Sequence, residues 1–107
     1  MKKTGIVIEF TQRNIVLWER EHGGESLSVM LAPQLSSLIE IVKVGNNNCD
    51  DDRAYEILEG VLDEEYSLFD LTLDLGEMLV KKGQLPRQAV QAMQEKMEAQ
   101  LNSLSQM

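Results

Sequence analysis

Apolar positions recur at helical spacing through the second half of the chain, most densely between Val61 and Lys82. On one helix, they form two faces: Leu62, Tyr66, Phe69, Leu73 and Val80 on one, and Leu68, Leu71, Leu75, Met78 and Leu79 on the other. A helix that is apolar on two sides must be covered on two sides. We therefore expect the rest of the chain to cover one face and another molecule, a second copy or a different protein, to cover the other.

The centre of this segment also fits a strand, because residues 69–75 alternate between apolar and polar side chains. We favour the helix, since the flanking residues are strong helix formers and Gly83 provides a stop. Three further helices are predicted to start near Pro33, Asp52 and Pro86. The last one runs to about Leu104 with a narrow apolar stripe. Residues 33–104 are thus predicted to form three to four helices.

The first third of the chain has a different pattern. Thr4–Phe10, Asn14–Glu21 and Ser26–Leu31 are rich in β-branched residues or alternate in polarity, which predicts a three-stranded antiparallel meander over residues 1–31. For Asn14–Glu21, a helix capped by Thr11 is the alternative. The expected fold is a single α+β domain spanning residues 1–107, and the alternative is a mostly α fold.

Charge is distributed unevenly along the 107 residues, whose formal net charge is −8. Between Asp50 and Glu77, eleven acidic residues face a single basic one, Arg53, so this segment carries −10 and the remainder +2. This sign argues against direct binding to nucleic acid or to an anionic membrane surface, and it suits a basic protein partner. The candidates for an acidic face are Asp63, Glu64, Asp70, Asp74 and Glu77.

Residues with catalytic or metal-binding chemistry are scarce. His22 and Cys49 are the only histidine and cysteine, and nothing in the sequence brings them together. The run from Asn46 to Asp52 lacks the central glycine and closing glutamate of a calcium loop, so a turn and helix cap are expected there. We therefore predict no enzyme activity, no metal and no cofactor.

The compartment is expected to be the cytoplasm. A lone cysteine cannot form an internal disulfide, which fits a reducing environment. The two lysines near the N-terminus resemble the start of a signal peptide, but the apolar run after them stops at Glu9, too early for one. No stretch is apolar over the length of a membrane span.

These features favour a small, acidic, non-enzymatic interaction module: an adaptor, assembly chaperone or inhibitor that self-associates as a homodimer or higher oligomer. The candidate partner-binding residues are Met78, Val90, Met93, Met97, Leu101 and Leu104. The alternative is an acidic nucleic-acid mimic or an antagonist of a basic protein. A small ligand-binding domain or enzyme ranks lowest.

Overall fold

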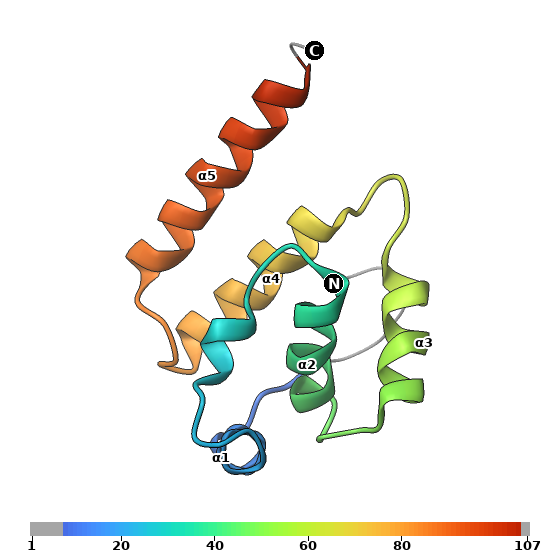
Figure 1. The fold of residues 1–107 in the computed structure, drawn as a ribbon, viewed down its shortest axis with the longest axis vertical. Helices are drawn as coiled ribbons and strands as arrows, with labels where there is room; N and C mark the ends of the chain where they lie inside the picture. Colours follow the sequence, from blue (N-terminus) through green and yellow to red (C-terminus); the bar gives the residue numbers. More distant parts are fainter. Residues whose placement is uncertain (1–7, 106–107) are drawn as a thin grey trace.

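The computed structural model describes residues 8–105, in which every regular element is a helix (Figure 1). In chain order these are α1 (Gln12–Glu21), the 3-10 helix η1 (Leu27–Met30), α2 (Leu35–Gly45), α3 (Asp51–Val61), α4 (Leu68–Lys81) and α5 (Arg87–Ser105). Within this range the β-type pairs are two isolated bridges, Glu9 with Asn46 and Asp63 with Tyr66. The predicted α+β fold is therefore wrong, and the mostly α alternative is the correct class.

The segment Asn14–Glu21, predicted as the second strand, lies in helix α1. Thr11 caps the helix, accepting a hydrogen bond from the Asn14 N–H at 3.1 Å. Ile15 and Trp18, one turn apart, are buried, whereas Val16 and Leu17 between them are exposed. Burial thus follows the helical period, and the β-branched pair does not decide the local structure.

The other two predicted strands are also absent from the described residues. Ser26–Leu31 contains η1, in which Leu27 is buried and Val29 is exposed. Of the first predicted strand, residues 4–7 lie outside the described part of the chain. Its remaining residues run past the end of α2, where the Glu9 N–H donates to the Gly45 carbonyl at 2.8 Å and Phe10 is buried.

The central segment is helical, but it is not one helix. Helix α3 ends at Val61, a six-residue loop (62–67) follows, and α4 begins at Leu68. Ser67 and Asp70 form a capping box in which each side chain accepts from the backbone N–H of the other residue. The helix predicted for residues 69–75 is confirmed, and the single helix predicted from Val61 to Lys82 is wrong.

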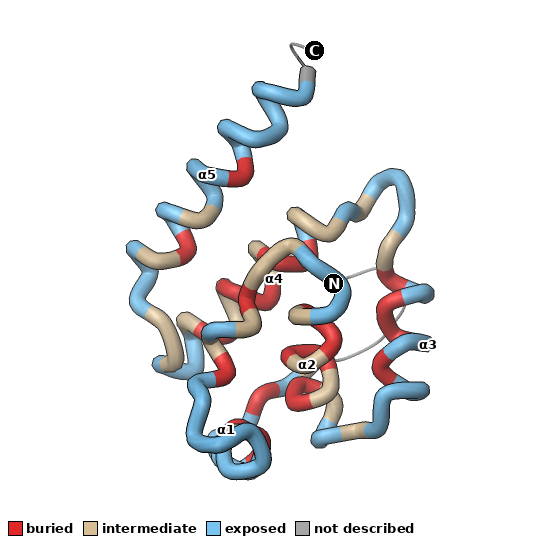
Figure 2. The backbone as a smooth tube through the Cα atoms, in the orientation of Figure 1, coloured by how far each residue is buried: buried red, intermediate tan, exposed pale blue. Residues whose placement is uncertain are grey.

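Helix α2 lies at the centre of the molecule. It packs against α1, η1, α3 and α4, and most of its tube has the colour of buried residues (Figure 2). Its side chains Leu38, Ile41, Val42 and Val44 are fully buried. Helices α2 and α3 run antiparallel, joined by a short turn, and α3 forms one edge of the body (Figure 1). Helix α5 packs mainly on α4, and its C-terminal half projects from the body (Figure 1).

Candidate functional site

An apolar groove lies on the surface between α2 and α3. Its volume is about 610 Å³, and it is lined by Leu35, Ser36, Ile39, Tyr55, Leu58, Glu59 and Leu62. We call it the α2–α3 groove. Leu35 is 51% exposed and Tyr55 is 52% exposed, an unusual accessibility for two large apolar side chains. Both side chains line the same groove.

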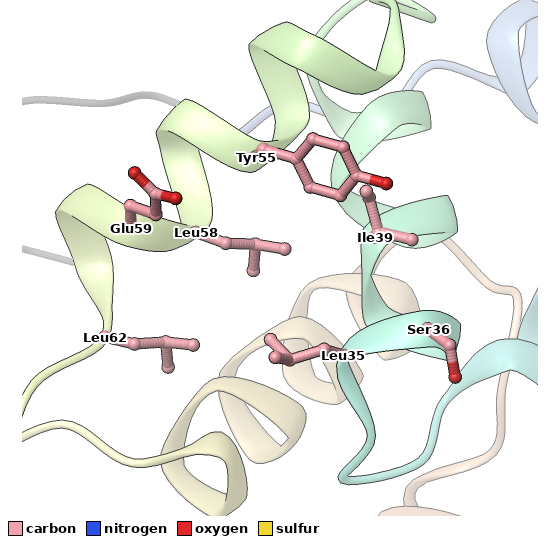
Figure 3. A pocket seen from close by; sticks show the side chains of 7 residues that line it. All are labelled: Leu35, Ser36, Ile39, Tyr55, Leu58, Glu59 and Leu62. Atoms are coloured by element: carbon pink, nitrogen blue, oxygen red, sulfur yellow. The ribbon is translucent and has the colours of Figure 1, made fainter.

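The antiparallel arrangement of the two helices produces this groove. The start of α2 lies opposite the end of α3, so Leu35 faces Leu62 (Figure 3). Leu58 points into the same space, and the Tyr55 ring extends towards Ile39 (Figure 3). The Glu59 carboxylate points away from the three leucine tips, so the floor is apolar and the polar groups sit at the edge (Figure 3).

Carboxylates flank the groove along α3. Asp52, Glu56 and Glu59 are spaced i, i+4 and i+7, which places them on one side of the helix, and all three are exposed. We call them the acidic stripe. Glu59 also lines the groove, and Asp52 lies one turn before the groove residue Tyr55, so the stripe borders the groove along α3. Glu56 pairs with Arg53 at 3.0 Å; Asp52 and Glu59 form no ion pair within residues 8–105.

The predicted acidic-face residues have mostly structural partners. On α4, Asp70 belongs to the capping box, Asp74 accepts a hydrogen bond from the Tyr66 hydroxyl, and Glu77 pairs with Arg87 at 2.7 Å. The hydrogen bond from Arg87 lowers the pKa of Glu77. In the α3–α4 loop, Asp63 accepts from two backbone N–H groups, those of Glu65 and Tyr66. Glu64 is exposed in the same loop.

The predicted partner-binding residues divide into two groups. Val90 and Met97 are buried, and Met78 and Met93 are half-buried against the core, so these four are engaged within the molecule. Leu101 is 45% exposed and Leu104 is 63% exposed at the projecting end of α5. Of the six candidates, these two have exposed apolar side chains.

His22 and Cys49 both line a small polar pocket of about 330 Å³, a proximity that the sequence did not indicate. The His22 ring stacks on Trp18, and its Nδ1 lies 2.7 Å from the Trp18 carbonyl oxygen. Burial, with the nearby charge of Asp50, raises the pKa of the Cys49 thiol. A raised pKa keeps the thiol neutral, which is the opposite of what a cysteine nucleophile needs.

Two other kinds of site were sought in residues 8–105. No group of three or more histidine, cysteine or carboxylate side chains is arranged to hold a metal ion. None of the helices described is both long and apolar enough to cross a membrane.

The sequence prediction missed the acidic stripe, although its spacing was visible. Asp52, Glu56 and Glu59 recur at helical spacing beside the apolar face that includes Tyr55 and Leu58. The exposure of Leu35 and Tyr55 had no such signal, because it depends on how α2 and α3 meet. No protein-family model, curated protein or solved structure matches this chain.

Proposed function

We propose that the protein binds a basic protein through the surface of α3 and thereby antagonises it. The observation that carries this proposal is the acidic stripe bordering an open apolar groove. Of the eleven carboxylates between Asp50 and Glu77, nine are exposed, and only Arg53 offsets them within that segment. A surface with this charge attracts cationic partners and raises their association rate.

An antagonist of a basic protein fits better than a mimic of nucleic acid. Neighbouring carboxylates of the acidic stripe are three or four residues apart, roughly 5–6 Å along the helix axis. Phosphates recur about every 3.4 Å along one DNA strand, and both strands contribute. The stripe is therefore sparser in charge than a duplex. It also borders apolar side chains, which a phosphate backbone does not offer.

The test compares two variants of equal net charge. The first neutralises the acidic stripe by Asp52→Asn, Glu56→Gln and Glu59→Gln. The control neutralises three exposed glutamates elsewhere, by Glu25→Gln, Glu95→Gln and Glu98→Gln. Both are immobilised beside the wild type, and the proteins that each retains from a cell extract are identified by mass spectrometry.

We expect the wild type and the control to retain the same basic protein and the stripe variant to lose it. With that protein purified, its association rate should fall several-fold for the stripe variant, and the dependence on ionic strength should flatten, because exposed charges act mainly on the encounter. Equal retention by all three proteins, or retention of no basic protein, would overturn the proposal.

Self-association is a second candidate function, favoured by the exposed Leu101 and Leu104 on the projecting end of α5. Burying such side chains against a second copy is favourable by about 1.5–3 kcal/mol each. We expect sedimentation at micromolar concentration to give a dimer or higher oligomer, and the double variant Leu101→Gln and Leu104→Gln to give a monomer. A monomeric wild type would remove this candidate.

The proposed activity is binding without catalysis, in the cytoplasm. The raised pKa of the Cys49 thiol argues against Cys49 as a catalytic nucleophile. The free state of Cys49 supports the cytoplasmic location, since unpaired thiols suit a reducing compartment.

A further inference from the structure

We infer that the α2–α3 groove receives an amphipathic helix of the basic partner, with its apolar face on the leucines and its lysines or arginines against the acidic stripe. This inference rests on the proposed function and adds the form and the chemistry of the segment that binds. Three properties of the groove lead to it: its apolar floor, the charge at its edge, and the shape of its walls.

The apolar floor of the groove favours an apolar occupant. Leu35, Leu58 and Leu62 converge on the same space, and the Tyr55 ring continues it towards Ile39 (Figure 3). Few polar groups line the groove, and the Glu59 carboxylate points away from the leucine tips, so a small polar ligand finds little to orient it (Figure 3). A row of apolar side chains matches this surface.

The negative charge at the edge of the groove favours an occupant with positive charge. Glu59 is the one charged residue among the described residues that line the groove, and Asp52 and Glu56 extend the negative charge along α3. The nearest basic side chain on α3, Arg53, is bonded to Glu56. An acidic segment would therefore meet like charge along the whole of α3.

The walls favour a helix over a strand. The lining residues on the α3 side extend from Tyr55 to Leu62, about 10.5 Å along a helix axis, which matches the distance from position i to i+7 of a third helix. Apolar residues at i, i+3, i+4 and i+7 would reach the groove, while the polar side of the same helix carries the lysines. Residues 8–105 contain no strand whose edge could take up an extended peptide.

The experiment uses synthetic peptides of about 16 residues, about 24 Å long as helices. The first has leucines at i, i+3, i+4 and i+7 and lysines at most other positions. The second has the same composition in a permuted order, without an apolar stripe. The third replaces each lysine of the first by glutamate. Binding is measured by fluorescence anisotropy of labelled peptide, against the full-length protein.

The protein variants are Leu35→Gln and Tyr55→Gln, which alter two half-exposed side chains of the groove without touching the core. Leu17→Gln is the matched control, since Leu17 is an exposed helical leucine that does not line the groove. A further variant, Ser36→Lys, adds positive charge at the edge of the groove.

We expect the amphipathic cationic peptide to bind the wild type and the Leu17→Gln protein equally. Leu35→Gln and Tyr55→Gln should each weaken binding about tenfold, as for truncation of an anchoring side chain. The permuted and glutamate peptides should bind at least tenfold more weakly, and Ser36→Lys should weaken the cationic peptide while leaving the fold unchanged by circular dichroism.

Other results would overturn the inference, and they separate it from the proposed function. If both cationic peptides bind equally and only the stripe variant weakens them, the groove is not the site and the binding of basic partners stands. If no cationic peptide binds and the stripe variant retains every captured protein, both the inference about the groove and the proposed function fail. If Leu35→Gln abolishes a dimer seen by sedimentation and no peptide binds, the occupant is a second copy of the chain.

Discussion

Gly45 shows how little space remains where the N-terminal segment crosses the end of α2. A Cβ atom at this position would overlap Ile8 Cγ2 and lie 3.1 and 3.3 Å from two atoms of the Phe10 ring. Phe10 is 1% exposed and belongs to the core, so it has nowhere to move without opening a gap elsewhere. The absence of a side chain at Gly45 is therefore what allows residues 8–10 to pack there.

Replacing Gly45 by alanine should destabilise the protein by about 1–3 kcal/mol, the usual cost of adding a methyl group to a filled core. Chemical denaturation followed by circular dichroism measures the change. Gln91→Ala, at an exposed position on α5, is the control and should shift stability by no more than about 0.5 kcal/mol. A Gly45→Ala protein as stable as the wild type would show that Ile8 and Phe10 move aside freely.

Tyr66 ties the α3–α4 loop to α4 through its hydroxyl, which donates to the Asp74 carboxylate. Burial is the main cause that raises the pKa of Tyr66, and the bond to Asp74 adds to it. A group with a raised pKa contributes stability that is complete below its unfolded pKa, about 10 for tyrosine. That contribution is lost as the pH rises further, because the unfolded state releases the proton first.

Tyr66→Phe should therefore cost about 1 kcal/mol at neutral pH, where the hydrogen bond is lost. Above about pH 10 the difference between the two proteins should shrink and then reverse, since only the wild type loses the stability linked to Tyr66. Urea denaturation of the wild type and Tyr66→Phe from neutral pH to above about pH 10 measures the loss at neutral pH and the reversal at high pH. A constant difference at every pH would mean that the Tyr66 proton is not held by the fold.

At the level of the elements, helix α5 is part of the core only as far as Met97. Val90 is 5% exposed and Met97 is 4% exposed, whereas Leu101 and Leu104 are accessible. Gly76 of α4 permits the close approach, because a Cβ there would lie 3.2 Å from Val90. The part of α5 up to Met97 therefore contributes to the core, and the part beyond Met97 is exposed.

Deleting residues 86–107 should leave a much less stable protein that is prone to aggregate. Each buried apolar side chain lost is worth about 1.5–3 kcal/mol, against a typical total stability of about 5–15 kcal/mol. Deleting only residues 101–107 keeps Val90, Met93 and Met97 and should change stability little. Circular dichroism and urea denaturation of the two truncated proteins distinguish these outcomes. Equal stability of both would mean that α5 is a docking arm along its whole length.

The element boundaries show what the sequence can and cannot determine. Helices α2, α3 and α5 were predictable because their apolar periods are regular and Pro33, Asp52 and Pro86 stand near their starts. The residue that caps α3 is Asp50, two positions before the predicted Asp52. The helix over Asn14–Glu21 was not predictable, because the composition of these eight residues fits a strand and the Thr11 cap fits a helix. The burial of Ile15 and Trp18 by the rest of the chain decides between them, and no local pattern reports it.

The break between α3 and α4 was missed for a similar reason. Residues 61–67 keep an apolar spacing that fits a helix, but Ser67 and Asp70 form a capping box that starts a new one. Asp63 and Glu65 were counted as charges, although Asp63 also stabilises the loop through its backbone contacts. The segment therefore forms two helices, and Leu62, the first residue after α3, lines the groove.

For the whole molecule, the site was less predictable than the fold. Leu35, Tyr55 and Leu58 all lie at helical spacing from other apolar residues in the sequence, a pattern that predicts burial in the core. Which of them stays accessible depends on the angle and register at which α2 meets α3, a property of the packed pair. The acidic character of α3 was evident from composition, but its position beside the groove was not.

The peripheral place of α5 has a consequence for how the molecule opens. A helix that packs mainly on one neighbour can detach without disturbing the other helices, so its opening costs less free energy than global unfolding. In native-state amide hydrogen exchange, α5 should therefore lose protection first and in one step. The amides of α2, which is surrounded by four elements, should exchange only when the whole molecule unfolds.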